Sequence, residues 1–444
     1  MLFTKRDLVK IIVPLMIEQA LAVTIGMLDS VMVSTAGESA VSGVSLVDSL
    51  NLLLVYIFSA LAGGGAVVIS QLLGRRDLES ARESSKQLVW VVGVVSTLIA
   101  VLSLVFRFTI LNLVFGKIEP DVMANASVYF LYTAMSYPFL GLYNAGAAVF
   151  RAMGDSKTSM YTSLVMNLLN VGGNALLIFV FNMGAAGAAI ATLFSRIVGA
   201  IVMLVLLKNK KRELFLDRIF HYKPNFKLIK RICGIGIPNG IENGIFQLGK
   251  VITQSFVSGF GTIAIASNAV ANSLTSLQYV PGTAIGLGMI VVVGRCIGAE
   301  EKMEAKRYAR KLLFVTYCSI WVITAILCGF SDQIVGLYSL STEATGLAKE
   351  IIFFHSIFVC TIWPIAFTLP NSFRAASDIK YTMILSVASM WVFRVGLSFV
   401  LGVLLNFGVW GIWIAMTCDW IFRAVMFLIR YLRGTWLKKY VYIE

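Results

Sequence analysis

Long apolar stretches alternate with short polar breaks along the whole chain of 444 residues. About 20 apolar residues in a helix cross the hydrocarbon core of a bilayer. Twelve stretches reach that length, and they lie near residues 10–33, 43–73, 87–106, 122–147, 158–181, 186–207, 233–257, 263–297, 309–330, 347–371, 381–404 and 409–430. The pattern predicts an all-α membrane protein with twelve transmembrane helices.

The basic residues indicate how the chain is oriented in the membrane. If the breaks are assigned alternately to two sides, 30 of the 37 Lys and Arg fall on one side, three on the other and four within spans. Short cytoplasmic loops retain Lys and Arg during insertion. We therefore expect both termini in the cytoplasm, in an inner or plasma membrane. The net charge of +14 follows from this topology, so it does not indicate nucleic-acid binding.

The composition excludes other classes. With 58% hydrophobic and 14% charged residues, the chain matches neither a soluble domain nor a disordered one. The six cysteines are scattered singly, as small core hydrophobes would be. No phosphate-binding GxxxxGK[ST] motif is present, and AGGGA at 62–66 indicates a close helix contact or a bend. No cofactor is expected, and the energy for any transport would come from an ion gradient.

The chain is duplicated. FRAMGDSK at 150–157 recurs as FRAASDIK at 373–380. Other residues recur in the second half at an offset of 224, and they are Pro14, Glu18, Gly74, Gly184 and Gly187. We expect lobes at 1–207 and 233–430, a basic linker at 208–232 and a tail at 431–444. Six spans in each lobe predict two pseudo-symmetric six-helix lobes related by an axis along the membrane normal. A cavity between such lobes is typical of secondary transporters.

Carboxylates within the spans are costly and need a partner or a task. They are Glu18, Asp29, Asp48, Glu242 and Asp419. Asp48 lies near the outer end of its span, where we expect it to be solvated.

Asp29 is the strongest candidate for a coupling-ion site. Asn167, Asn170 and Asn174 recur at spacings of three and four, which places them on one helix face. Amide oxygens beside a carboxylate can replace the water shell of a small cation, and Thr192 can add a hydroxyl oxygen.

The duplication places this site in the first half alone. At the offset of 224, Asp29 becomes Thr253, Asn170 becomes Arg394 and Asn174 becomes Ser398. The second half has lost the acid and gained a cation.

Two further groups have alternative interpretations. Glu18 and Glu242 each follow a proline by four positions, and either satisfy carbonyls that the proline frees or line the cavity. Several large side chains either stack on a flat substrate or belong to the core. They are Met27, Tyr137, Tyr143, Phe246, Tyr279 and Trp363.

The chain resembles the MATE family of multidrug and toxic-compound extruders in three motifs. They are the paired FRAMGDSK-type loops, LLGRRDLESAR at 72–82 with its counterpart GRCIGAEEKMEAKR, and MNLLNVGGN at 166–174. The resemblance covers essentially the whole chain. It implies cation-coupled antiport, by alternating access, of bulky and often cationic aromatic compounds.

The resemblance also implies the ion site. The family pattern of a first-helix Asp, two Asn/Asp positions in the fifth helix and a sixth-helix Thr matches Asp29, Asn170, Asn174 and Thr192. One branch has Asp where this chain has Asn174, so coupling to Na⁺ and coupling to H⁺ both stay open.

Two alternatives to an antiporter remain. The same superfamily contains flippases of lipid-linked saccharides, which would require a strongly cationic cavity. An integral-membrane enzyme would require a nucleophile, base or metal cluster at membrane depth, and the sequence presents none. For the antiporter we expect a monomer whose partners are drug-like small molecules and membrane lipid.

Overall fold

The computed structural model describes residues 2–35, 37–116, 118–217, 223–336, 338 and 340–438, and within these ranges it is helical, without strands. The chain divides into two compact units. Residues Lys5–Gly240 form what we name the N-terminal unit. Ile241–Glu444, together with Met1–Thr4, form the C-terminal unit.

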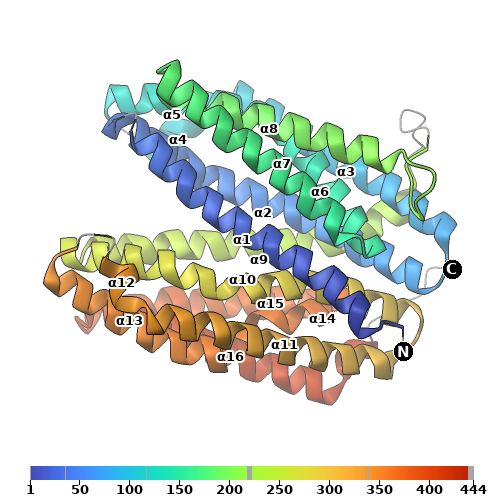
Figure 1. The fold of residues 1–444 in the computed structure, drawn as a ribbon. Helices are drawn as coiled ribbons and strands as arrows, with labels where there is room; N and C mark the ends of the chain where they lie inside the picture. The colour runs from blue at the N-terminus through green and yellow to red at the C-terminus, as the bar shows by residue number, and fades with distance from the viewer. Residues whose placement is uncertain are drawn as a thin grey trace. The chain divides into compact units, whose positions relative to one another are not determined.

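In the N-terminal unit, α1 packs against α7, α7 against α8, and α2 against both α5 and α6 (Figure 1). The elements are α1 (Lys5–Ser34), α2 (Glu38–Gly74), α3 (Leu78–Val105), α4 (Arg107–Phe115), α5 (Pro120–Met135), α6 (Tyr137–Met153), α7 (Ser156–Asn174), the π-helix η1 (Ala175–Val180) and α8 (Gly184–Leu207), followed by the first half of α9 (Phe226–Ser258).

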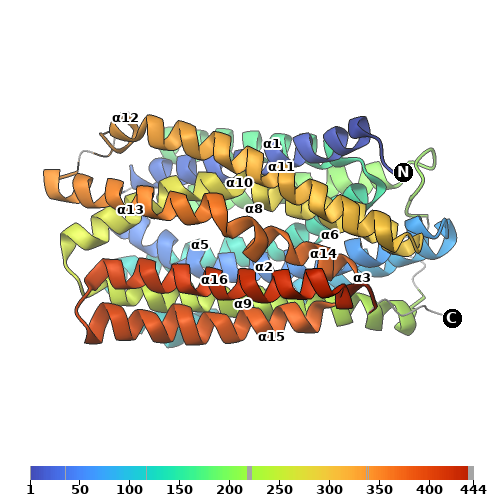
Figure 2. The same cartoon turned by 90° about the horizontal axis from the view of Figure 1, so that it is seen from below.

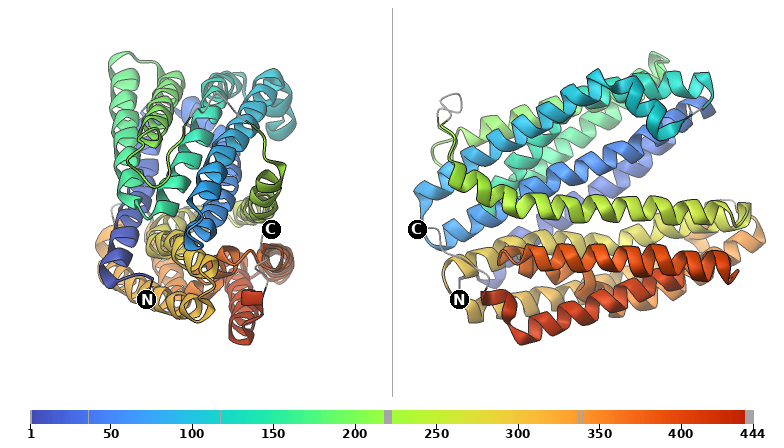
Figure 3. Two further views of the ribbon diagram at one scale, coloured as in Figure 1. Left: turned by 90° about the vertical axis from the view of Figure 1, so that its right-hand side faces the viewer. Right: turned by 180° about the vertical axis from the view of Figure 1, so that it is seen from behind.

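In the C-terminal unit, α10 packs against α11 and α13, and α16 packs against the π-helical continuation of α15 (Figure 2). Figure 3 shows both units from two further sides. After α9 come α10 (Thr262–Gly298), α11 (Lys302–Gly329), α12 (Ser331–Gly336), α13 (Thr342–Thr361), η2 (Pro364–Thr368), α14 (Pro370–Ala375), α15 (Ile379–Ser389), η3 (Met390–Leu397), η4 (Phe399–Leu404), α16 (Gly408–Arg433) and η5 (Thr435–Lys438).

The internal repeat is visible in the backbone. The bounds of α10, α11 and η4 are those of α2, α3 and η1 shifted by the offset of the sequence repeat. The uncommon positive φ angles recur in the same register: Arg76 at 62° and Glu300 at 64°, Asn182 at 53° and Asn406 at 57°. Left-handed non-glycine residues are rare, so such pairs mark equivalent turns. The two repeated lobes predicted from the sequence are confirmed.

Ten helices of the described chain are long and apolar enough to cross a membrane. The other two predicted spans correspond to α9 and to the pair α5–α6, which the turn at Ser136 interrupts. The helices also expose large apolar side chains, such as Leu113 at 84% and Val105 at 69%. Such exposure is costly in water and normal against lipid tails. The protein is therefore a multi-pass membrane protein.

Each unit has its own apolar core. In the N-terminal unit it contains Val47, Phe58, Phe130 and Tyr137, and in the C-terminal unit it contains Trp363, Trp413 and Trp420. These clusters hold α2, α5 and α6 in one unit, and α10, α13 and α16 in the other, in fixed register. The N-terminal core also includes Val33 of α1 and Ala188 of α8, and these two helices carry candidate site residues discussed below.

The AGGGA segment is a close helix contact, as the sequence indicated. A β-carbon at Gly64 would lie 2.6 Å from the Gly236 nitrogen and 2.7 Å from the Ile232 carbonyl oxygen. Only glycine lets the backbones of α2 and α9 approach this closely.

Candidate functional site

The structure brings the predicted ion-site residues together in the N-terminal unit. Asp29 lies on α1, Asn170 and Asn174 on α7, and Thr192 on α8. The Asn174 Nδ2 donates to Asp29 Oδ1 at 2.8 Å. The Asn170 side chain lies between Asp29 and Thr192. We name these four residues the Asp29 cluster.

Asn170 bridges Asp29 and Thr192. Its Nδ2 donates to both carboxylate oxygens of Asp29 at 3.0 Å, and its Oδ1 accepts from Thr192 Oγ1 at 3.1 Å. In this orientation each polar atom of the amide has a complementary partner, and the donors suit an ionised Asp29. A proton or a cation on Asp29 would compete with these donors.

One oxygen in the Asp29 cluster is available to a ligand. Asn174 is 1% exposed, and its Oδ1 has no hydrogen-bond partner among the described residues. A buried oxygen without a partner carries a free-energy cost that a bound cation or a proton donor would remove. Asn167, the third residue of the stripe, donates instead to Ser163 Oγ at 3.4 Å, away from Asp29.

A second acid stands near the cluster and was underestimated from the sequence. Asp48 accepts hydrogen bonds from Tyr129 Oη at 2.9 Å and from Asn51 Nδ2 at 3.2 Å, so it is bound within the helix bundle. Asp48 and Arg196 are both close enough to act electrostatically on Asp29. The spacing of Asp48 and Asn51, three positions apart on one helix face, is the signal that could have revealed this group.

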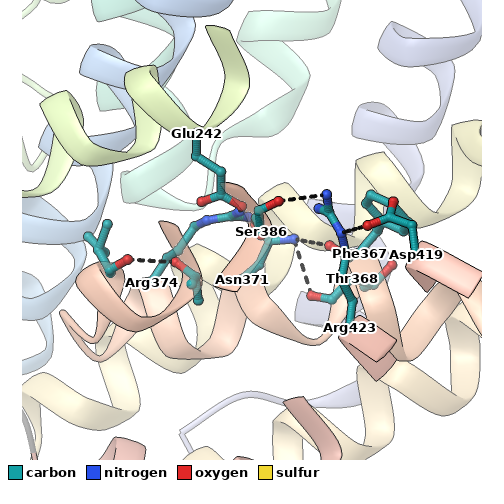
Figure 4. Close-up of polar contacts among 10 residues, drawn as sticks. Glu242, Phe367, Thr368, Asn371, Arg374, Ser386, Asp419 and Arg423 are labelled. Carbon is teal, nitrogen blue, oxygen red and sulfur yellow. Dashed lines mark hydrogen bonds and ion pairs between the residues drawn. The ribbon is translucent and has the colours of Figure 1, made fainter. Parts of the chain in front are cut away.

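Glu18 and Glu242 form equivalent ion pairs. Glu18 Oε1 lies 3.7 Å from Arg151, and its Oε2 accepts from Ser159 Oγ at 2.9 Å. Glu242 accepts from Arg374 at 2.7 Å (Figure 4). Both arginines belong to the repeated FRAMGDSK-type motif, in which Arg151 lies in the last turn of α6 and Arg374 lies on α14, so each half ties its first helix to the helix that carries this motif. These partners were not predicted from the sequence, although all four residues recur at nearly one offset.

The remaining candidate cavity residues are distributed between the units. Tyr137 and Tyr143 are buried in the N-terminal unit, and the Tyr137 hydroxyl donates to Asn51 Oδ1 at 2.7 Å. In the C-terminal unit, Tyr279 stacks on Trp363 with ring centroids 5.1 Å apart. The side chain of Met27 lies outside the described residues. A substrate-binding role for any of these side chains stays a prediction.

In the C-terminal unit the counterpart of the Asp29 cluster has the opposite charge. Arg394 stands in the register of Asn170, and Ser398 in that of Asn174. Thr253, which replaces Asp29, donates its hydroxyl to the Lys250 carbonyl at 2.9 Å. The structure thus places carboxylate and amide groups in one repeat and a guanidinium in the other.

Comparisons with known proteins identify this architecture. The family model described as MatE matches residues 14–176 and again 238–400, two stretches in the register of the repeat. An uncharacterized transporter, YisQ, of Bacillus subtilis is 27% identical, over 96% of this chain and 94% of its own length. A probable multidrug resistance protein, NorM, of Thermotoga maritima is 26% identical, over 98% and 94%. A solved structure of a multidrug resistance MATE family transporter of the MOP superfamily, in an outward-facing conformation, has the same fold with a TM-score of 0.91. It is 19% identical and covers 98% of this chain and 96% of its own.

Proposed function

The chain belongs to the MatE family, and from this premise we propose that it is a cation-coupled efflux antiporter of the cell membrane. Its cargo would be bulky, often cationic aromatic compounds. The names of relatives such as the Thermotoga NorM support the multidrug part of the proposal. The observation that carries the coupling part is the Asp29 cluster, with a carboxylate, two amides and a hydroxyl in mutual contact.

The chemistry of the cluster suits a small cation or a proton. A protonated Asp29 would donate a hydrogen bond to an amide oxygen that turns toward it, and Na⁺ would take carboxylate and amide oxygens as ligands. The residues present fit either ion, since every contributing atom is oxygen and Asn174 Oδ1 has no other described partner. Binding neutralises Asp29, which changes its attraction for the neighbouring amide donors. The first helix then repacks against α7 and α8, and the cargo is released outward by alternating access.

The energy is sufficient for this scheme. One elementary charge that crosses a potential of 100 mV supplies about 2.3 kcal/mol, which corresponds to about a 50-fold concentration gradient. One ion for each exported molecule is therefore a workable drive.

The test compares two equivalent positions of the repeat. In everted membrane vesicles, uptake of a cationic aromatic dye is driven by an imposed H⁺ or Na⁺ gradient. Asp29→Asn should abolish gradient-driven uptake because it removes the group that the ion neutralises. Thr253→Ala, the matched control in the second half, should keep most of it, because the one hydrogen bond that its hydroxyl makes among the described residues stays within its own helix turn. Full dye transport by Asp29→Asn under every ionic condition would contradict the proposal.

A further inference from the structure

Three cations surround one aromatic ring in the C-terminal unit. The charged groups of Lys250, Arg394 and Arg423 lie 5.5, 5.4 and 5.3 Å from the centroid of Phe246. Among the described residues, the carboxylate in contact with them is Asp419. This group therefore carries an excess of two positive charges at membrane depth.

Asp419 is committed to one of the three. Arg423 donates from Nε to Asp419 Oδ1 at 2.8 Å and from a terminal nitrogen to the Ser386 carbonyl at 2.9 Å (Figure 4). The same carboxylate accepts a hydrogen bond from Ser389. The other carboxylate oxygen, Oδ2, has no hydrogen-bond partner among the described residues and faces Arg394 at 4.0 Å, so Asp419 is hydrogen-bonded to Arg423 and only in a long ion pair with Arg394.

Arg394 and Lys250 are left without such a partner. The nearest Arg394 nitrogen is 4.0 Å from Asp419 Oδ2, beyond hydrogen-bond distance, and no other described residue accepts from this side chain. Lys250 is exposed and has neither an ion pair nor a side-chain acceptor within the described part of the chain. Cations in a membrane span are costly unless an anion or a polar ligand accompanies them. Their presence points to an anion that the chain does not itself supply.

The repeat gives an independent indication. Ser398, one helical turn beyond Arg394, is 0% exposed, and its hydroxyl has no hydrogen-bond partner among the described residues. Its counterpart in the other half is Asn174, which donates to Asp29. A buried hydroxyl one helical turn from a guanidinium that makes no hydrogen bond in the described chain is a second donor that lacks an acceptor.

An aromatic wall adjoins these donors. Phe246 contacts Phe367 edge to face at 6.0 Å, and Phe367 stacks on Trp363 at 5.3 Å. Trp363 in turn stacks on Tyr279. A flat apolar body can lie against such rings while an acidic group reaches the cations.

We propose that the C-terminal unit contains a binding site for the acidic group, carboxylate or phosphate, of an aromatic or otherwise apolar molecule. Lys250 and Arg394 contact the anion, and Phe246 supports the apolar body. This inference rests on the proposed transport function in so far as the occupant is cargo. A cargo molecule that carries both an acidic group and an amine would suit this site and would also agree with the preference for cationic cargo proposed above.

The test uses a matched pair of probes, 1-pyrenebutyrate and its uncharged amide. Their binding to the purified full-length protein in phosphatidylcholine nanodiscs is followed by fluorescence anisotropy, with empty discs subtracted. The wild type should prefer the carboxylate about 10-fold or more, as charge-assisted hydrogen bonds allow. The double variant Lys250→Gln/Arg394→Gln should bind both probes equally, with affinity for the amide unchanged.

Controls separate charge from folding. Lys311→Gln removes a cation from α11 that has no described ion pair, and it should retain the full preference. Arg394→Lys should retain part of it. If the double variant does not fold, Lys250→Gln alone should still lower the preference about threefold or more, because this side chain is exposed. Equal binding of both probes by the wild type, or an unchanged preference in the folded double variant, would overturn the site.

Two further comparisons identify the occupant and isolate the inference. Addition of phosphatidylglycerol to the discs should displace the carboxylate probe if the natural anion is a lipid headgroup, and should leave it bound if the anion is a soluble molecule. The Asp29→Asn variant should keep the carboxylate preference. If the wild type shows Asp29-dependent transport but no preference for the carboxylate probe, the anion site alone is rejected. If the wild type prefers the carboxylate probe but shows no ion-driven transport, antiport is rejected and the anion site stands.

Discussion

At the scale of single residues, Asn174 decides how much negative charge surrounds the ion. The Asp29 cluster holds one carboxylate and two neutral amides. A cation that exchanges its water shell for these groups therefore meets one formal negative charge. Asn174→Asp adds a second carboxylate at 2.8 Å from the first, at the place of the present hydrogen bond. Two carboxylates at this distance cannot both ionise freely, so they share a proton or hold a cation.

The effect of Asn174→Asp therefore identifies the coupling ion. For a Na⁺ site, we expect tighter Na⁺ binding, so that transport is half-maximal at a several-fold lower Na⁺ concentration. For a proton site, the pH at half-maximal transport should instead move upward, without any response to Na⁺. Transport measured against pH at fixed membrane potential, with and without Na⁺, separates the two. A variant that is indistinguishable from the wild type in both series would place the ion elsewhere.

The sequence predicted part of this site for a clear physical reason. Helical periodicity placed Asn170 and Asn174 on one face, and the cost of an intramembrane carboxylate singled out Asp29. Periodicity within one helix does not report which neighbour that face meets. For this reason the sequence did not separate Asn167, which bonds Ser163, from the other two. It also did not predict that Arg151 and Arg374 neutralise Glu18 and Glu242.

At the scale of helices, the ion pair of Glu242 with Arg374 ties α9 to α14. Both side chains are largely buried, with 7% and 15% of their surface exposed. Removal of one partner leaves the other charge buried, at a cost of about 3–5 kcal/mol, whereas removal of both is far milder. Arg374→Gln should therefore destabilise the protein much more than Glu242→Gln/Arg374→Gln.

Thermal unfolding in detergent, followed by size-exclusion chromatography with fluorescence detection, gives this comparison. The midpoint of the double variant should lie between those of Arg374→Gln and the wild type. The same experiment on Glu18 and Arg151 should give a smaller difference, because their atoms are 3.7 Å apart and Ser159 also serves Glu18. Equal losses for the single and double variants would show that the pair of Glu242 with Arg374 does not hold these helices together.

The cytoplasmic end predicted for α7 contains a carboxylate whose stabilising effect depends on pH. Asp155 caps α7 by accepting from the Thr158 nitrogen at 3.2 Å, and it pairs with Arg212. Partial burial raises its pKa, but the hydrogen bonds from Thr158 and Arg212 outweigh burial and hold the pKa below its ordinary value of 3.8. A lowered folded-state pKa adds stability above the unfolded-state pKa, and this contribution disappears as pH falls through the folded-state pKa.

Asp155→Asn isolates the charge, since asparagine caps a helix as well as aspartate does. The variant should unfold at a lower temperature than the wild type at pH 7. The difference should shrink below pH 4 and vanish once the wild-type carboxyl is protonated. A difference that stayed constant down to pH 3 would mean that the cap, and not the ionised carboxylate, provides the stability.

At the scale of the whole molecule, the duplication was the most informative property of the sequence. A repeat that spans half the chain implies that the two halves share one folding pattern. The paired helix bounds and the paired positive φ angles follow from it. Apolar stretches predicted all spans, yet not the break at Ser136 or the π-helical segments η1, η3 and η4. Those depend on packing against neighbouring helices, which hydropathy does not describe.

The distribution of basic residues predicts the orientation of the whole chain. The segment from Lys208 to Arg231 carries nine Lys and Arg, more than any other break between spans, and should remain in the cytoplasm. The break that contains Glu119 should lie outside, because it carries few cations. Single cysteines introduced as Lys211→Cys and Glu119→Cys, in a background whose six native cysteines are replaced, test both sides. In intact cells a membrane-impermeant thiol reagent should label position 119 and not 211. Labelling of 211 from outside would invert the topology, and with it the direction in which an ion bound at Asp29 would drive transport.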